Sequence, residues 1–116
     1  MTTIFVDGSA ALAPDAAIHL AHLPETGHDL VLVAPDDHAA TSRELWRSRV
    51  TELPAEPPRG SWFVTSDPDT CSDRRPGLRT LLIAPREEGP RPTRCDSRAR
   101  DLRDAVLEIL AADAMA

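Results

Sequence analysis

The 116-residue sequence contains no lysine, and all 13 of its basic residues are arginines. Every mechanism that needs a lysine side chain is therefore excluded. Acidic residues number 19, which gives a formal net charge of −6. Because nucleic acids and anionic membranes attract basic surfaces, this acidic balance argues against broad binding to either of them.

Cysteines, aromatic residues and long apolar runs are also scarce. The two cysteines, Cys71 and Cys95, are too few for a disulfide framework and lack metal-motif spacing, so we expect reduced thiols in a cytoplasmic protein. The four aromatic residues form no repeated stacking pattern, so single-strand nucleic-acid recognition gains no support. No run of 18 apolar residues predicts a membrane span, and the N-terminus lacks the pattern of a secretory signal.

What the sequence does contain is an alternation of apolar runs and helical segments. We expect strands at residues 3–6, 30–34, 50–53, 61–65 and 79–84, and helices at 14–23, 36–46 and 97–110. Apolar runs without polar alternation are typical of strands buried on both faces, as in parallel sheets. The sequence therefore predicts one α/β domain over residues 1–116, a three-layer Rossmann-like architecture with a mainly parallel five-stranded sheet flanked by helices.

The connections complete this prediction. Residues 67–75 are expected to form a helical turn and residues 85–94 a surface loop, after which Asp96 or Ser97 caps the last helix. In sheets of this kind, ligands bind at the carboxyl ends of the strands, near the point where the strand order reverses. Asp7 and Ser66-Asp67 stand at two of those predicted ends.

Three segments carry a resemblance to a known family. The first strand runs into Phe5-Val6-Asp7-Gly8-Ser9, residues 20–28 read LAHLPETGH before a strand that ends at Ala34, and residues 66–73 read SDPDTCSD after the fourth strand. In these motifs, and in the phrasing of residues 77–86, nearly the whole chain resembles the haloacid dehalogenase (HAD) superfamily. The resemblance implies a HAD-like domain over residues 1–116, with no room for a cap domain.

The chain departs from that family at three catalytic positions. Phe5 stands where the family has its nucleophilic aspartate, and a phenyl ring can neither attack phosphorus nor bind Mg²⁺. Ala34 replaces the family's threonine or serine, and Arg59 at best takes the place of its lysine, with a different geometry. We therefore expect that phosphatase or hydrolase activity is lost and that the chain acts as a binding or assembly module.

The acidic residues that remain are Asp7, which matches the family's general acid/base, and the cluster of Asp67, Asp69 and Asp73. We favour a structural explanation, in which Asp7-Gly8 forms an ordinary turn and Asp67 or Asp69 caps the helical turn after the fourth strand. The alternative is a weak Mg²⁺ site formed by Asp7 and Asp67 in a weak Mg²⁺-dependent phosphohydrolase; otherwise no cofactor is expected. The predicted pocket consists of Phe5, Ser9, Ala34, Arg59, Ser66 and Asp67.

Other groups of residues give weaker indications of function. His19 and His22 lie three residues apart on a predicted helix, but no third ligand has a defined spacing, so we expect solvated histidines. A protein partner or self-association is expected, through the arginine-rich residues 74–94 or the last helix, while nucleic acid and membranes are not. A third hypothesis is an unrelated, small Rossmann-like binding module that shares only strand and turn chemistry with the HAD family.

Overall fold

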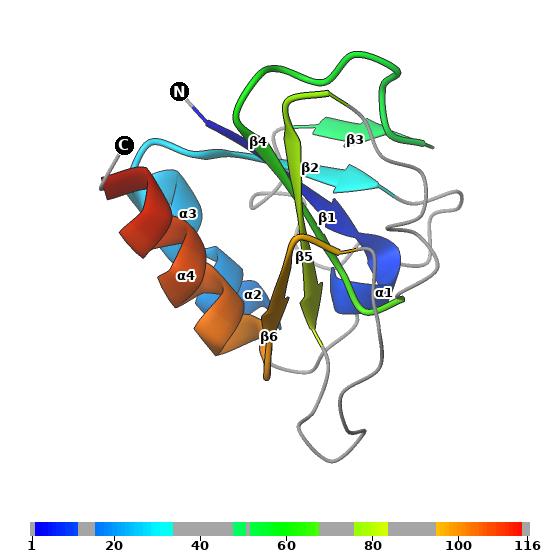
Figure 1. The fold of residues 1–116 in the computed structure, drawn as a ribbon. Coiled ribbons are helices and arrows are strands. Elements are labelled where there is room, and N and C mark those ends of the chain that lie inside the picture. The colour runs from blue at the N-terminus through cyan, green and yellow to red at the C-terminus, as the bar shows by residue number, and fades with distance from the viewer. Residues whose placement is uncertain are drawn as a thin grey trace.

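A computed structural model describes residues 2–11, 16–33, 48–50, 52–67, 76–83 and 95–114 of the chain. Six strands form one sheet in the order β3-β2-β1-β4-β5-β6, and every neighbouring pair is parallel (Figure 1). The strands are β1 (Thr3–Asp7), β2 (Asp29–Val33), β3 (Ser48–Val50), β4 (Ser61–Thr65), β5 (Leu78–Ile83) and β6 (Ser97–Ala99).

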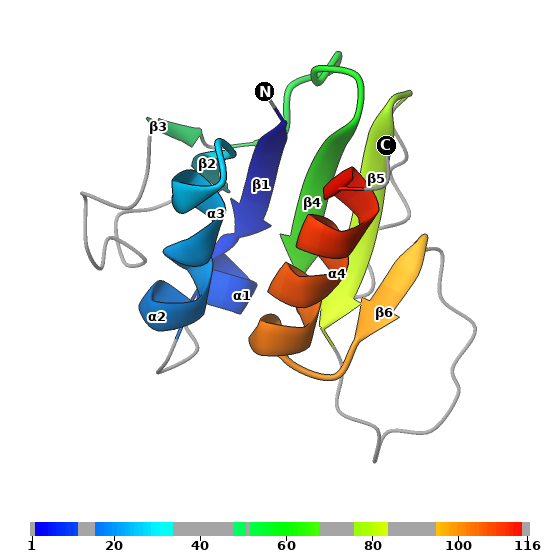
Figure 2. The same ribbon diagram turned by 90° about the vertical axis from the view of Figure 1, so that its left-hand side faces the viewer.

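Four helices are present in the described residues: α1 (Gly8–Ala11), α2 (Ala16–Leu20), α3 (His22–Glu25) and α4 (Leu102–Ala114). Figure 2 shows α2, α3 and α4 on the same face of the sheet, with α4 in front of β4 and β5. None of the described helices is long and apolar enough to cross a membrane.

The strand order is that of doubly wound Rossmann-type sheets. From β1 the chain adds β2 and β3 on one side, then crosses back and adds β4, β5 and β6 on the other side. The order therefore reverses between β1 and β4, and the carboxyl ends of these two strands lie next to each other. This is the position at which open parallel sheets form ligand sites.

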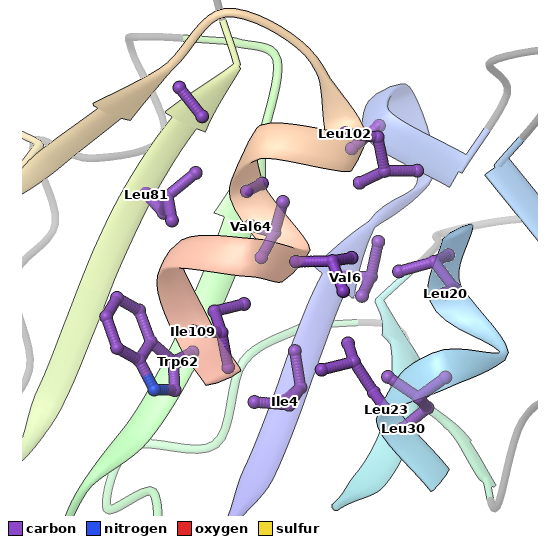
Figure 3. Packing of buried hydrophobic residues seen from close by; sticks show 14 of the residues in the cluster. Ile4, Val6, Leu20, Leu23, Leu30, Trp62, Val64, Leu81, Leu102 and Ile109 are labelled. Atoms are coloured by element: carbon purple, nitrogen blue, oxygen red, sulfur yellow. The ribbon is translucent and has the colours of Figure 1, made fainter. Parts of the chain in front are cut away.

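The main hydrophobic core lies between the sheet and helices α2, α3 and α4. Side chains alternate across a strand, so Ile4 and Val6 of β1 face these helices and are fully buried. Figure 3 shows them packed close to Leu23 and Ile109, which come from α3 and α4. Burial of apolar area at this interface, worth about 25 cal/mol per Å², fixes the helices on the sheet.

A second cluster lies on the opposite face of the sheet. Phe5 pairs in register with Val31 of β2 and with Phe63 of β4, and all three are buried together with Val33 and Leu78. Both faces of the central strands are therefore apolar, which explains why their sequences show continuous apolar runs rather than alternation.

The C-terminal part of the fold corrects three expectations. The sheet has six strands rather than five, because Ser97–Ala99 forms β6 where the sequence predicted the start of a helix. The last helix begins only at Leu102, and its cap is Asp101, whose Oδ1 accepts a hydrogen bond from the Asp104 amide at 2.8 Å. Asp96 instead accepts hydrogen bonds from the amide and the hydroxyl of Thr80, at 2.9 and 3.1 Å.

Earlier parts of the chain follow the prediction more closely. The helix predicted at residues 14–23 is divided in the described residues into α2 and α3. The short third strand lies at Ser48–Val50, slightly before its predicted position. The helix predicted at residues 36–46 and the loop at 85–94 lie outside the described residues, as does the turn after residue 67.

The expectation of reduced thiols is wrong for Cys95, which is disulfide-bonded. Nothing in the local sequence predicts this bond, because a disulfide depends on the distance between two sulfur atoms in the folded chain rather than on their spacing along the sequence. Cys71, the other cysteine, lies outside the described residues.

Candidate functional site

Asp7 and Thr65 lie at the adjacent carboxyl ends of β1 and β4, where the strand order reverses. The register pairs Val6 with Val64, so the next residue of each strand also comes close to the other. The Thr65 hydroxyl donates a hydrogen bond to Asp7 Oδ2 at 2.8 Å. The two strand ends are therefore joined by side chains as well as by the sheet.

The same hydroxyl also connects to the loop that follows β4. Thr65 is fully buried, and its Oγ1 accepts a hydrogen bond from the Asp67 amide at 3.0 Å. Thr65 thus receives one hydrogen bond from the Asp67 backbone and donates another to the Asp7 carboxylate. This chain of bonds fixes the carboxylate at the edge of the sheet, where it is only half-buried.

Phe5 lies two residues before Asp7 and therefore points to the same face of β1. Its ring is 4% exposed and belongs to the second hydrophobic cluster, next to Phe63. At this position the sheet presents a packed aromatic ring and no group that could act as a nucleophile or a metal ligand.

The other predicted pocket residues are distributed unevenly. Ser66 and Asp67 are exposed beside Thr65, and Ser9 lies in α1, directly after β1. Ala34 lies outside the described residues. Arg59 is exposed in the connection that leads into β4, so the length of this strand, about 13 Å at 3.3 Å per residue, separates it from the site.

Two of the predicted residues could contribute to a cation site. The carboxylates of Asp7 and Asp67 are the type of ligand that Mg²⁺ prefers. Within the residues that the structure describes, no group of three or more His, Cys, Asp or Glu side chains is placed to hold a metal ion. The two-carboxylate site stays a prediction.

A second polar cluster, which sequence reasoning missed, lies at the amino ends of the strands. Asp113 of α4 accepts hydrogen bonds from Arg79 Nη2 at 2.9 Å and from Trp62 Nε1 at 3.5 Å, and it contacts His28 Nε2 at 2.9 Å. The guanidinium of Arg79 also stacks on the Trp62 ring, 3.9 Å from its centroid, and donates to the Gly60 carbonyl at 2.7 Å.

The surroundings of Asp113 favour its ionised form. Burial alone would raise the pKa of this carboxyl, but the hydrogen bonds with Arg79, His28 and Trp62 together hold the pKa below its ordinary value. The partners lie 34, 85 and 51 residues away in the sequence. Only the folded chain brings them together, so local patterns give no signal for this cluster.

The cluster includes a chain of hydroxyl, imidazole and carboxylate, because Thr26 Oγ1 lies 2.8 Å from His28 Nδ1. A catalytic triad has a similar composition, but it also needs amide donors for an oxyanion. Here the amides of Thr26, Gly27 and His28 already donate to the carbonyls of Leu23 and Pro24. The Thr26 hydroxyl also donates to Leu23 O at 2.9 Å, so this arrangement ends α3 and is structural.

A groove of about 400 Å³ lies on the helical side of the molecule, between α2–α3 and α4. Its apolar lining includes Ile18 of α2 and Val106, Leu107 and Leu110 of α4. Ile18 is 69% exposed and Leu107 is 55% exposed, an unusual degree for large apolar side chains that lie together. Both predicted surface histidines, His19 and His22, line this groove.

Comparison with protein-family models, with curated proteins and with solved structures finds no match to this chain.

Proposed function

We propose that the chain is a HAD-like domain without phosphohydrolase activity that serves in binding or assembly. The observation that carries the proposal is the burial of Phe5, 4% exposed, at the position where the HAD motif has its nucleophile. A phosphoryl transfer to the protein needs a lone pair at that position, and an aromatic ring packed against Phe63 offers none.

Two further features agree with a binding role. The Asp7 carboxylate is held by the buried hydroxyl of Thr65, an arrangement that stabilises the junction of β1 and β4. The groove between α2–α3 and α4 provides an apolar surface for a partner. The net charge of −6 makes a protein a better candidate for this partner than nucleic acid or an anionic membrane.

The rival proposal is a weak Mg²⁺-dependent phosphohydrolase that uses Asp7 and Asp67. An assay with a generic aryl phosphate and Mg²⁺ separates the two, applied to the wild type, to Asp7→Asn and to Glu56→Gln. Glu56 is exposed in the connection before β4 and serves as the matched control. We expect no turnover from any of them; turnover that Asp7→Asn removes and Glu56→Gln retains would establish the rival.

Mg²⁺ binding can be tested separately from turnover. A cation that binds only the folded state raises the melting temperature. If Asp7 and Asp67 form a Mg²⁺ site, millimolar Mg²⁺ stabilises the wild type and has no such effect on Asp7→Asn, with Ca²⁺ and Na⁺ as ionic controls. Equal responses of the two proteins would reject the site.

An unrelated Rossmann-like binding module is the other alternative. The strand order is shared by doubly wound sheets of many activities, and fold alone does not determine function. Partial phosphatase activity in a folded Phe5→Asp variant would favour HAD-like ancestry, because that substitution restores the nucleophile of the motif.

A cytoplasmic location is likewise a prediction from the sequence. The disulfide at Cys95 weighs against it, because disulfides persist mainly in oxidising compartments. Alkylation of free thiols at the moment of cell lysis, followed by mass spectrometry, measures the redox state in the source organism. Fully alkylated cysteines would support the cytoplasm, and protected cysteines an oxidising compartment.

A further inference from the structure

The exposed side of α4 is apolar for most of its length. Leu107, Ala111 and Ala114 are exposed and recur at helical spacing, and Leu110 lies half-buried beside them in the groove. Ile18 of α2 adds a large exposed side chain across the groove. A single exposed apolar residue is ordinary, but several large apolar side chains that line one groove point to an interaction site.

The two opposite charges of the groove lie at its two ends. Arg103 is in the first turn of α4, the end of this helix that lies beside α2 in Figure 2. Glu25 ends α3, three residues before His28, which contacts Asp113 in the last turn of α4. Ten residues of α4 separate Arg103 from Asp113, which corresponds to about 15 Å along the helix.

Figure 2 shows the same arrangement in space. Helices α2 and α3 follow one another along one side of the face, and α4 runs beside them in the same direction. The groove therefore has a positive end at Arg103, an apolar centre at Leu107 and a negative end at Glu25.

We propose that this groove is the contact surface for a second copy of the chain. The two-fold axis lies in the plane of the interface, close to Leu107, and is perpendicular to the long direction of the groove. The grooves of the two copies therefore run in opposite directions, so that Arg103 of each copy meets Glu25 of the other. The two Leu107 side chains then pack near the axis, with Ile18 of each copy towards the outside. Such an isologous contact needs one self-complementary patch, and the groove has that charge pattern.

A second copy of the chain complements the charges of this groove better than a partner of one charge sign does. A partner of one charge sign would leave either Arg103 or Glu25 facing a like charge, and like charges across an interface oppose binding. Within the described residues, no acidic side chain forms an ion pair with Arg103, while Glu25 has only an exposed, 3.7 Å contact with His22. Both charges are therefore accessible for pairing between copies.

This inference names the partner that the proposed binding role leaves open, and it rests on that role. Sedimentation equilibrium of the full chain tests it. We expect a concentration-dependent dimer in the wild type and a dissociation constant about tenfold higher in Arg103→Glu and in Glu25→Arg, because each change makes two symmetric contacts repulsive. The double variant restores both pairs with reversed signs and should return to within about threefold of the wild type.

Two more variants complete the experiment. Leu107→Glu places two like charges near the axis and should give a monomer, whereas Glu56→Arg, a charge reversal outside the groove, should leave the dimer unchanged. Circular dichroism checks that each variant is folded. A wild type that stays monomeric, a dimer insensitive to Leu107→Glu, or additive weakening in the double variant would each overturn the inference.

Different results test the second-copy inference and the proposed function. A monomer without phosphatase turnover overturns only the second-copy inference, whereas turnover removed by Asp7→Asn overturns the non-hydrolytic role whatever the oligomeric state. A wild-type monomer that binds a small molecule or another protein in the groove would also contradict the second copy as its occupant.

Discussion

Arg79 at the start of β5 donates a hydrogen bond from Nη2 to Oδ1 of Asp113, in the last turn of α4, at 2.9 Å. The contact joins the amino-terminal ends of the strands to the C-terminal end of α4, which covers this face of the sheet. A carboxylate at a helix C-terminus is unfavourable by itself, because the helix dipole is negative there. Arg79 and His28 supply the compensating hydrogen bonds, so this position of Asp113 depends on both partners.

Asp113→Asn should therefore destabilise the fold although the side chain keeps its size. The amide weakens the charge-assisted bond from Arg79 and presents an NH₂ group to one of the former donors. We expect a loss of about 1–3 kcal/mol in the free energy of unfolding, measured by urea denaturation. Glu108→Gln, the same type of change at a half-buried site on α4, should alter stability by no more than about 0.5 kcal/mol. Equal effects of the two variants would show that the Asp113 contacts add nothing.

The same carboxyl should make stability depend on acidity. Burial opposes ionisation of Asp113, but its hydrogen bonds, with that from Arg79 the largest, lower the pKa in the folded chain. A lowered pKa stabilises the fold fully above the unfolded value of about 3.9, and this contribution is lost as the pH falls through the folded pKa. The stability advantage of the wild type over Asp113→Asn should therefore be complete at about pH 5 and shrink below about pH 4. An advantage that grows towards pH 3 would contradict this assignment.

Much of the sheet could be predicted from local sequence. The continuous apolar runs at β1, β2, β4 and β5 predicted buried parallel strands, and all four lie close to their expected positions. The carboxyl-end position of Asp7 followed from the same pattern, since the residue after an apolar run stands at the edge of the sheet. These features depend on few residues, and each has its cause nearby in the chain.

The missed features depend on contacts between distant residues. Ser97–Ala99 is too short and polar to be recognised as a strand, and it forms β6 because it can pair with β5. Asp96 has the residue type of a helix cap, but the backbone and hydroxyl of Thr80 bind it instead. The cluster around Asp113 has no local signal at all, because its partners come from three other segments.

The corrected start of α4 can be tested directly. Asp101 caps this helix, so Asp101→Ala should lower the free energy of unfolding by about 0.5–2 kcal/mol, and Asp101→Asn should retain most of the stability. Ser97 lies in β6 and caps nothing, so Ser97→Ala should change the value by less than about 0.5 kcal/mol. Thermal or urea denaturation followed by circular dichroism measures all three. A larger loss for Ser97→Ala than for Asp101→Ala would favour the start predicted from the sequence.

Packing of Phe5 should dominate the stability of the second hydrophobic cluster. Phe5→Leu keeps most of the apolar volume and should cost less than about 1.5 kcal/mol, whereas Phe5→Ala leaves a cavity and should cost about 3–5 kcal/mol. Phe5→Asp places a carboxylate in the same apolar position, and its fold must be checked before its activity is interpreted. Urea denaturation of the three variants gives this order. A mild effect of Phe5→Ala would show that the ring is not packed as described.

The hydroxyl of Thr65 should contribute more to the stability of the fold than the apolar volume of this side chain does. Thr65→Val keeps the shape of this fully buried side chain but removes the donor to Asp7 and the acceptor for the Asp67 amide. Two part-buried hydrogen bonds are lost and their partners stay in place, so we expect a loss of about 1–3 kcal/mol.

Thr65→Ser is the matched control, because it removes a methyl group and keeps the hydroxyl. If the hydrogen bonds are the main contribution, Thr65→Ser is more stable than Thr65→Val in urea denaturation, although valine is the more apolar residue. The reverse order would mean that apolar packing stabilises this position and that the Thr65–Asp7 contact contributes little. Hydrogen exchange at the Asp67 amide gives an independent measurement, since only loss of the Thr65 acceptor should accelerate it.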